Sequence, residues 1–244
     1  MPDKREHRGQ HPADEKLFSK EALPGLRQAV ADYSLLLTKG YAETSSLKLV
    51  GDRFELTQRQ RLAVMRTACS DQQLANRKNK QIGIGEITGK PIAIDGYNLL
   101  ITVEAAMSGG LIFVGRDGCL RDLASIHGTY RKVTETIPAI ELIGNFLQQS
   151  KITEALWLLD SPVSNSGRLK TLIREIAEKN KWVWEIELVT SPDAALIKGD
   201  PDSIGIAASS DSVILDGCKK WVNLAGEIIK TIIPDAKIID LNEQ

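Results

Sequence analysis

The sequence predicts an α/β protein in which a mostly parallel sheet is covered by helices on both faces, preceded by a small α-helical region. Two observations carry this prediction. From Pro91 onward, short apolar runs alternate with amphipathic stretches, whereas residues 1–80 are dominated by the three- and four-residue steps of helices. A sheet of this kind places its ligand site at the carboxyl ends of its strands.

Six apolar runs are expected to be strands, and the stretches between them are expected to be helices. The expected strands are IAID (92–95), LIFVG (111–115), ALWLLD (155–160), WVWEIELV (182–189), SIGIAAS (203–209) and AKIIDL (236–241). The expected helices span residues 104–108, 119–133, 136–150, 165–181, 192–199 and 211–232. These elements make residues 91–244 an α/β domain.

The helical region, residues 1–80, opens with a helix expected from Ser19 to Lys39 and ended by Gly40. The polar stretch 71–90 has no clear period and is expected to be a linker to the α/β domain. The expected boundaries are therefore 1–80 for the helical region and 91–244 for the domain.

Residues 45–69 allow two interpretations. Gly51-Asp52 could turn a hairpin, or Thr57 could cap the second of two helices. The two helices are favoured, because the second carries apolar residues and arginines on opposing faces. Such a pair resembles a helix-turn-helix in outline, which leaves DNA reading and simple packing both open.

Composition excludes several classes of protein. The 244 residues are 42% hydrophobic and 26% charged, with no apolar run long enough to span a membrane and a polar start unlike a secretory signal. The three cysteines lack CxxC spacing, so a cytoplasmic protein with free thiols is expected. Residues 1–80 carry a net charge of +5 and the remainder −6, which indicates either a polyanion partner or a solvated basic surface.

Several aspartates follow predicted strands. Asp95 ends IAID, Asp160 ends ALWLLD, Asp211 follows IAASS and Asp117 follows LIFVG. Neighbouring strands would bring these carboxylates together, and such a cluster is costly unless a cation neutralises it. Magnesium or manganese suits a site made only of oxygen ligands. The simpler alternatives are a helix N-cap for Asp211 and a turn for Asp117.

Two motifs resemble a known family. IDGYN is similar to the opening of NYN and related PIN-like nuclease domains, and ASSDSVILD is similar to their later acidic motif. The resemblance implies a three-layer α/β/α, Rossmann-like fold and an acidic cluster that binds divalent metal for RNA hydrolysis. The whole chain also resembles an uncharacterised prokaryotic two-part family, with a helical N-terminal region and a PIN-like C-terminal region.

The resemblance assigns roles to four residues. Asp95 and Asp211 would be metal ligands, Asp160 would supply a middle carboxylate, and Asn98 would position a ligand or the substrate phosphate. These three aspartates would be the catalytic residues, and Asp117 is a further candidate metal ligand.

Other polar residues are candidates for binding the substrate. The stretch DSPVSNSGRLK has hydroxyls, an amide and an arginine where nuclease domains usually have further acids, which suits either a phosphate site or an ordinary capped helix start. The segment RDGCLRDLASIHGTYRKV adds an arginine and a histidine that could contact phosphate or donate a proton. The substrate-binding candidates are Ser164, Asn165, Ser166, Arg168, Arg121 and His127.

The sequence thus favours a metal-dependent nuclease acting on RNA, with a homodimer as one open arrangement. The alternative is a non-catalytic PIN-like module that binds nucleic acid or a partner. A haloacid dehalogenase-type phosphatase is disfavoured, because that mechanism needs a second aspartate two residues after the first, where this chain has Tyr97.

Overall fold

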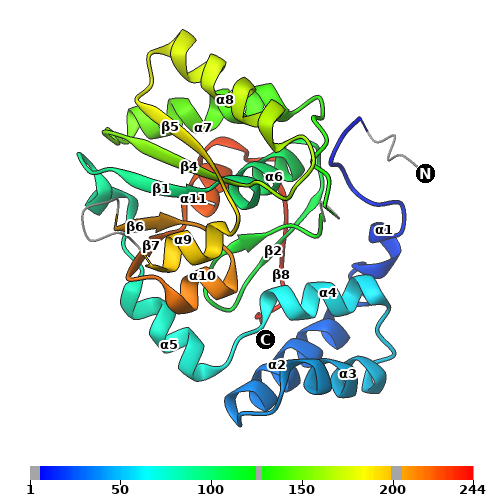
Figure 1. The fold of residues 1–244 in the computed structure, drawn as a ribbon. Helices are drawn as coiled ribbons and strands as arrows, with labels where there is room; N and C mark the ends of the chain where they lie inside the picture. Colours follow the sequence, from blue (N-terminus) through cyan, green and yellow to red (C-terminus); the bar gives the residue numbers. More distant parts are fainter. Residues whose placement is uncertain (1–5, 125–127, 199–204, 244) are drawn as a thin grey trace.

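The computed structural model describes residues 6–124, 128–198 and 205–243. At its centre is a five-stranded parallel sheet with the order β5-β4-β1-β6-β7 (Figure 1). The strands are β1 (Ile92–Asp95), β4 (Ala155–Asp160), β5 (Trp184–Val189), β6 (Ile206–Ala208) and β7 (Lys220–Val222). The first strand of the domain is therefore its middle one, flanked by β4 and β6.

Helices cover both faces of this sheet, as the sequence predicts. Ile94 and Trp157 point into a core shared with one set of helices, and the alternate residues Ala93 and Leu158 point into a second core shared with another set. The first set is α6 (Gly96–Met107), α7 (Thr136–Gln149), α8 (Ser166–Asn180) and α11 (Leu224–Ile232). The second set is α9 (Pro192–Lys198) and α10 (Ser212–Gly217) (Figure 1). The result is a three-layer α/β arrangement of the Rossmann-like kind.

A second, three-stranded sheet joins the two parts of the chain. Its order is β3-β2-β8, with β2 (Leu111–Val114) parallel to β8 (Lys237–Asp240) and antiparallel to β3 (Leu120–Arg121). The N-terminal helices pack on this sheet, where Phe18 contacts Phe113 with ring centroids 4.9 Å apart. The helical region and the α/β domain therefore share one apolar core.

The N-terminal helices are α1 (Asp14–Leu17), α2 (Leu23–Thr38), α3 (Glu43–Arg53), α4 (Gln58–Thr67) and α5 (Asp71–Lys80), followed by a 3₁₀ turn, η1 (Ile84–Ile87). The two-helix interpretation of residues 45–69 is confirmed. The Thr57 side chain accepts a hydrogen bond from the Gln60 backbone N–H, and the Gln60 side-chain oxygen accepts one from the Thr57 backbone N–H, which forms a capping box. Gly40 follows α2 with a φ of +81°, a conformation that favours glycine.

The linker predicted for residues 71–90 is wrong in its first half, where α5 lies. Ser70 caps this helix with a second capping box. Hydrophobic periodicity could not reveal α5, because its one buried residue is Arg77 rather than an apolar stripe.

Three further predictions are corrected. The helix expected over 119–133 is not found in the described part of that segment, which instead begins with β3. The helix expected over 211–232 is broken by β7, because Trp221 is fully buried in the sheet core between α10 and α11. The strand run 111–115 forms β2 as expected, but in the second sheet rather than the main one.

Two findings bear on the expected class of protein. No helix within the described ranges is long and apolar enough to cross a membrane. All three cysteines are buried free thiols.

Candidate acidic site and the adjoining cavity

Asp95 is the last residue of β1, and the backbone directly after it, at Gly96, packs closely against the neighbouring strand β4. The helix α6 begins immediately at Gly96. A Cβ atom on Gly96 would lie 2.6 Å from Leu159 Cδ2 and 2.9 Å from the Leu158 carbonyl oxygen, so a larger residue would push α6 away from β4. Glycine at this position therefore lets the strand end and the helix begin against the neighbouring strand.

The Asp95 carboxylate is buried and has few stabilising partners. Its side chain accepts a hydrogen bond of 2.8 Å from Ser209 Oγ, which in turn accepts one of 2.9 Å from the Asp211 backbone N–H. Burial raises the pKa of Asp95 to about 7, and the nearby charges of Asp211 and Asp193 add to the rise, while the Ser209 hydrogen bond opposes it. This carboxyl group is in an environment that disfavours its charge.

Asp160 lies on the same side of the sheet, further along. Asp95 pairs with Leu158 in the β1–β4 register, so Asp160 is two residues beyond that pair. Because side chains alternate along a strand, Asp160 projects toward the same face as Leu158, which is the face that α9 and α10 cover. Burial raises the pKa of Asp160 as well.

A fourth carboxylate, Asp193, belongs to this group and is absent from the sequence-based candidates. It lies in the first turn of α9, which contacts β1 and β4. Burial raises its pKa, and the charges of Asp211 and Asp160 raise it further. The signal was available in the sequence, since Asp193 follows the β5 run just as the other aspartates follow theirs. We refer to Asp95, Asp160, Asp193 and Asp211 as the acidic edge.

Asp211 also serves as the N-cap of α10, as its simpler interpretation predicts. Its Oδ1 accepts hydrogen bonds from the backbone N–H groups of Val213 at 2.8 Å and Ile214 at 3.4 Å. Within the described residues, no hydrogen bond engages its second oxygen. The loop that carries Asp211 is tied to α6 by Asn98, whose Oδ1 accepts hydrogen bonds from the Ser210 backbone N–H and hydroxyl at 3.0 and 2.9 Å.

The acidic edge does not form a ready-made metal cage. Among the residues that the structure describes, no three His, Cys, Asp or Glu side chains are placed so that they could hold a metal ion together. Magnesium, however, is commonly bound by one or two carboxylates together with water and substrate phosphate oxygens. The donor set at the acidic edge is all carboxylate, and its charges raise the pKa of Asp95 and of Asp193, so it suits a site of that kind.

Asp117 is placed elsewhere, which does not support its assignment as a metal ligand. Its carboxylate oxygens accept hydrogen bonds from Arg121 at 2.9 and 2.7 Å and from Arg77 at 2.7 Å. Burial by itself would raise the pKa of Asp117, but the two guanidinium groups hold it well below its usual range. The reason is topological: Asp117 follows β2, which lies outside the main sheet.

Arg77 extends these pairs into a network between α5 and α10. It also donates to both carboxylate oxygens of Asp216, at 2.6 and 2.9 Å. Arg121, a predicted substrate contact, donates to the Ser210 carbonyl at 2.7 Å and so connects the network to the loop before Asp211. We call Arg77, Asp117, Arg121 and Asp216 the arginine network.

Of the four candidates near the start of α8, two have side-chain contacts within the protein and the other two are exposed. Asn165, with a φ of +71°, donates from its side chain to the Tyr130 carbonyl at 3.0 Å, and neither Asn165 nor Ser166 provides a side-chain cap for the helix. Ser166 is buried, whereas Ser164 and Arg168 are exposed. His127 lies outside the described residues.

The arginines of α4 are likewise engaged by the protein itself. Arg59 pairs with the buried Asp14, and Arg61 pairs with Asp52 at 2.8 Å. Arg66 donates to the Asp122 backbone carbonyl and side chain. These contacts favour packing over DNA reading as the role of this helix pair.

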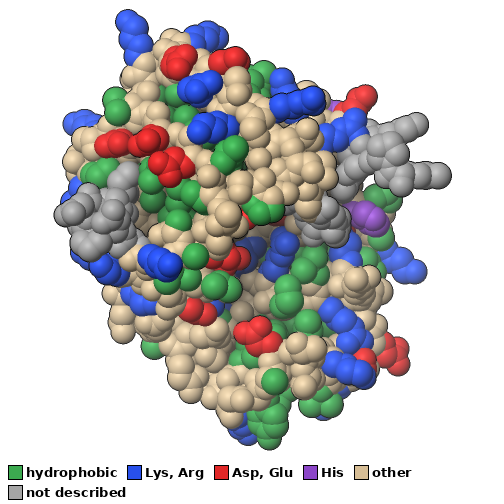
Figure 2. Space-filling view, in the orientation of Figure 1, with side chains coloured by type: hydrophobic (Ala, Val, Ile, Leu, Met, Phe, Trp, Pro, Cys, Tyr) green, Lys and Arg blue, Asp and Glu red, His purple; other side chains and the backbone are tan. Residues whose placement is uncertain are grey.

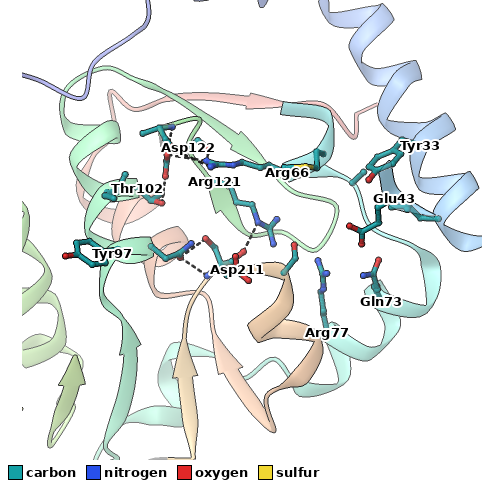
Figure 3. A pocket seen from close by; sticks show the side chains of 18 residues that line it. Tyr33, Glu43, Arg66, Gln73, Arg77, Tyr97, Thr102, Arg121, Asp122 and Asp211 are labelled. Carbon is teal, nitrogen blue, oxygen red and sulfur yellow. Dashed lines mark hydrogen bonds and ion pairs between the residues drawn. The ribbon is translucent and has the colours of Figure 1, made fainter. Parts of the chain in front are cut away.

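A cavity of about 390 Å³ adjoins the acidic edge. It lies between the helical region and the α/β domain, and Asp211, Asn98 and Ser210 line it on the side of the domain. Figure 2 shows basic side chains deep in the hollow between these two parts, and Figure 3 shows the lining from nearby. Arg66, Arg77 and Arg121 are among the residues that line it.

Comparison with known proteins places this chain in a family. Residues 84–227, more than half of the chain, match a family model described as a domain of unknown function (DUF5616). The chain belongs to the DUF5616 family. Residues 25–80 match a second model, described as a protein of unknown function (DUF434), so each match falls in one of the two parts of the chain. The expected membership of an uncharacterised two-part family is thereby confirmed.

One relative matches most of the chain. It is an uncharacterised protein of Methanocaldococcus jannaschii, 31% identical over 207 residues, and the match covers 84% of this chain and 97% of the relative. No solved structure matches the chain significantly.

Proposed function

We propose that this protein is a divalent-metal-dependent nuclease of the PIN-like kind, acting on RNA at the acidic edge. One observation carries the proposal. Four carboxylates gather where β1, β4 and β6 end and α9 begins, and within the described residues none of them has a lysine or arginine partner within ion-pair distance. Unneutralised carboxylates at the ligand-binding end of a parallel sheet are suited to a cation and a phosphodiester.

The residues of the chain have distinct parts in this proposal. Asp95 and Asp211 would hold magnesium or manganese, with Asp160 and Asp193 adding negative charge. When bound, the cation neutralises the charge of the phosphodiester and lowers the pKa of a water molecule that it holds. Because burial raises the pKa of Asp95 to about 7, binding of the cation would release a proton from this carboxyl group, and the Ser209 hydroxyl holds the carboxylate in place.

The resemblance of IDGYN and ASSDSVILD to NYN and PIN-like domains supports the same assignment. Asn98 in the first motif and Ser210 in the second hydrogen-bond to each other, so the two motifs meet at the acidic edge. The contact keeps the loop carrying Asp211 beside the strand carrying Asp95.

A second candidate function is a PIN-like module that binds nucleic acid without cutting it. Two observations favour this candidate. Asp211 uses one carboxylate oxygen as a helix cap, and the described residues contain no three-ligand metal group. In that case the domain would have the fold of a PIN-like nuclease, but the acidic edge would not catalyse cleavage.

The decisive experiment compares wild type, Asp95→Asn and Asp235→Asn on single-stranded RNA and DNA, with magnesium, with manganese and with EDTA. Asp235 is exposed and makes no hydrogen bond to a described residue, so its substitution is a matched control. We expect Asp95→Asn to lower the cleavage rate of RNA by about 10²–10⁴-fold, because it removes a proposed metal ligand, and Asp235→Asn to have no effect.

Cleavage that persists in EDTA, or that Asp95→Asn leaves unchanged, would contradict the nuclease proposal. Binding of RNA without cleavage under every metal condition would instead support the non-catalytic module.

A further inference from the structure

The cavity beside the acidic edge has the size and lining of a ligand pocket. Its volume of about 390 Å³ is within the range of small-molecule sites, roughly 300–1,000 Å³. Leu37 and Met65 line it from the helical region, and Ile101 lines it from α6 of the domain. These apolar groups provide surface against which a flat ring could pack.

One tyrosine hydroxyl in the lining is free to bind a ligand. Tyr33 is 2% exposed, and no described residue hydrogen-bonds to its hydroxyl. Figure 3 shows this hydroxyl turned toward the middle of the lining side chains. Because Tyr33 lines the cavity and its hydroxyl has no partner among the described residues, this group is available to hydrogen-bond a ligand.

The arginine network provides further unused donors. A guanidinium has five N–H groups, and the described contacts of Arg77 and Arg121 with carboxylates and a carbonyl use three N–H groups on each. Both residues line the cavity, and both are at least nine-tenths buried. Guanidinium groups held this rigidly are suited to phosphate oxygens.

We propose that this cavity binds one nucleoside monophosphate unit of a single-stranded RNA, next to the acidic edge. The apolar wall and Tyr33 would receive the base, and the free N–H groups of Arg77 and Arg121 would receive the phosphate. Proteins that recognise single-stranded RNA commonly stack a splayed base on aromatic or apolar side chains and hydrogen-bond its edge. The choice of RNA as the source of the nucleotide rests on the proposed function.

The two parts of the chain both contribute to this pocket. Tyr33 and Arg77 lie in the segment matched by one family model, and Asn98 and Arg121 lie in the segment matched by the other. The helical region is therefore not an appendage to the domain: it completes a binding site that the domain alone would leave open.

The test is calorimetric titration of the full chain in EDTA with the four ribonucleoside 5′-monophosphates, and with adenosine and inorganic phosphate separately. Wild type is compared with Tyr33→Phe, which removes only the hydroxyl, and Ala68→Leu, which adds bulk to the lining. Ala31→Leu, on the exposed side of α2, is the matched control. Thermal melts establish that each variant is folded.

We expect at least one monophosphate to bind more tightly than adenosine or phosphate alone. Ala68→Leu should weaken its binding at least about tenfold and Tyr33→Phe about two- to tenfold, the effect of one hydrogen bond, while Ala31→Leu should leave it unchanged. The proposal is overturned if no monophosphate binds at millimolar concentration, if phosphate alone binds equally well, or if folded Ala68→Leu binds normally.

Asp95→Asn separates this proposal from the nuclease proposal. Because the titration contains no metal and needs no cleavage, the variant should still bind the monophosphate. If Asp95→Asn still cuts RNA, the nuclease proposal fails while the binding result stands. If wild type cuts RNA in magnesium but binds no monophosphate in EDTA, the pocket proposal fails while the nuclease proposal stands.

Discussion

The acidic edge and the arginine network are both built around aspartates, but their surroundings are opposite. In the network, Asp117 is almost fully buried and accepts hydrogen bonds from two guanidinium groups, which hold its pKa below the usual range. At the acidic edge, Asp95 is also buried but has a hydroxyl as partner and other carboxylates as neighbours, and its pKa rises to about 7. Burial is common to both, so the charge of the neighbours decides the direction.

This difference separates a structural use of carboxylates from a candidate functional use. Paired charges in the network join α5, α10 and the loop after β2, and thereby fix the helical region against the domain. Unpaired charges at the acidic edge cost free energy in the folded protein, and a bound cation is what would recover it. The following predictions test this contrast, in order of expected effect.

The largest effect is expected from Arg77→Met. Removal of this guanidinium leaves Asp117 with Arg121 as its one cation and Asp216 with the Gln73 amide but no ion pair, and breaking a buried pair typically costs about 3–5 kcal/mol. Urea denaturation of the variant measures the loss. Arg53→Met is the control, because its ion pair with Asp32 is long, at 3.6 Å, and exposed, and should contribute less than about 1 kcal/mol. Equal stability of the two variants would show that the arginine network contributes no more to stability than an exposed ion pair.

Asp95→Asn should have a pH-dependent effect on stability. The pKa of Asp95 is raised from 3.8 to about 7, so the folded protein binds this proton more tightly than the unfolded chain does. The stabilisation is present below about pH 4 and is lost as the pH rises toward 7, whereas asparagine cannot ionise. We expect the variant to match wild type at pH 4 and to be more stable by about 2–4 kcal/mol at pH 8.

Urea denaturation at both pH values checks this expectation, with Asp235→Asn as the pH-independent control. Magnesium should stabilise wild type at pH 8 by about 1–3 kcal/mol at ten to a hundred times its dissociation constant, and should do so less for Asp95→Asn. A stability difference that does not vary with pH would show that the pKa of Asp95 is not raised in the folded protein.

The smallest effect is expected from Gly96→Ala. The added methyl group would contact Leu159 and the Leu158 carbonyl, which should cost about 1–3 kcal/mol and displace the start of α6 from the acidic edge. Gly167→Ala is the matched control, because a Cβ there has no neighbour within 4 Å, and this substitution in α8 should stabilise by up to about 1 kcal/mol. Thermal melts give both values, and a neutral Gly96→Ala would show that the approach of α6 to β4 can relax.

The sequence determined which elements form wherever the apolar pattern was strong. The runs 92–95 and 155–160 became β1 and β4, and Thr57 capped α4, because strand alternation and helix capping depend on nearby residues. It also placed Asp95 and Asp160 at strand ends, which is a local property. It missed α5, where a buried arginine takes the place of an apolar stripe.

Only the tertiary structure decided which strand ends lie together. Asp95 and Asp211 meet because β1 and β6 are neighbours, while Asp117 is diverted to the arginine network because β2 pairs with β8 in another sheet. Asp193 joins the acidic edge through the packing of α9 on β1 and β4. Strand order arises from contacts between residues far apart in the chain, and local propensity carries little information about it. The same is true of the cavity, whose two walls come from segments that meet only in the folded protein.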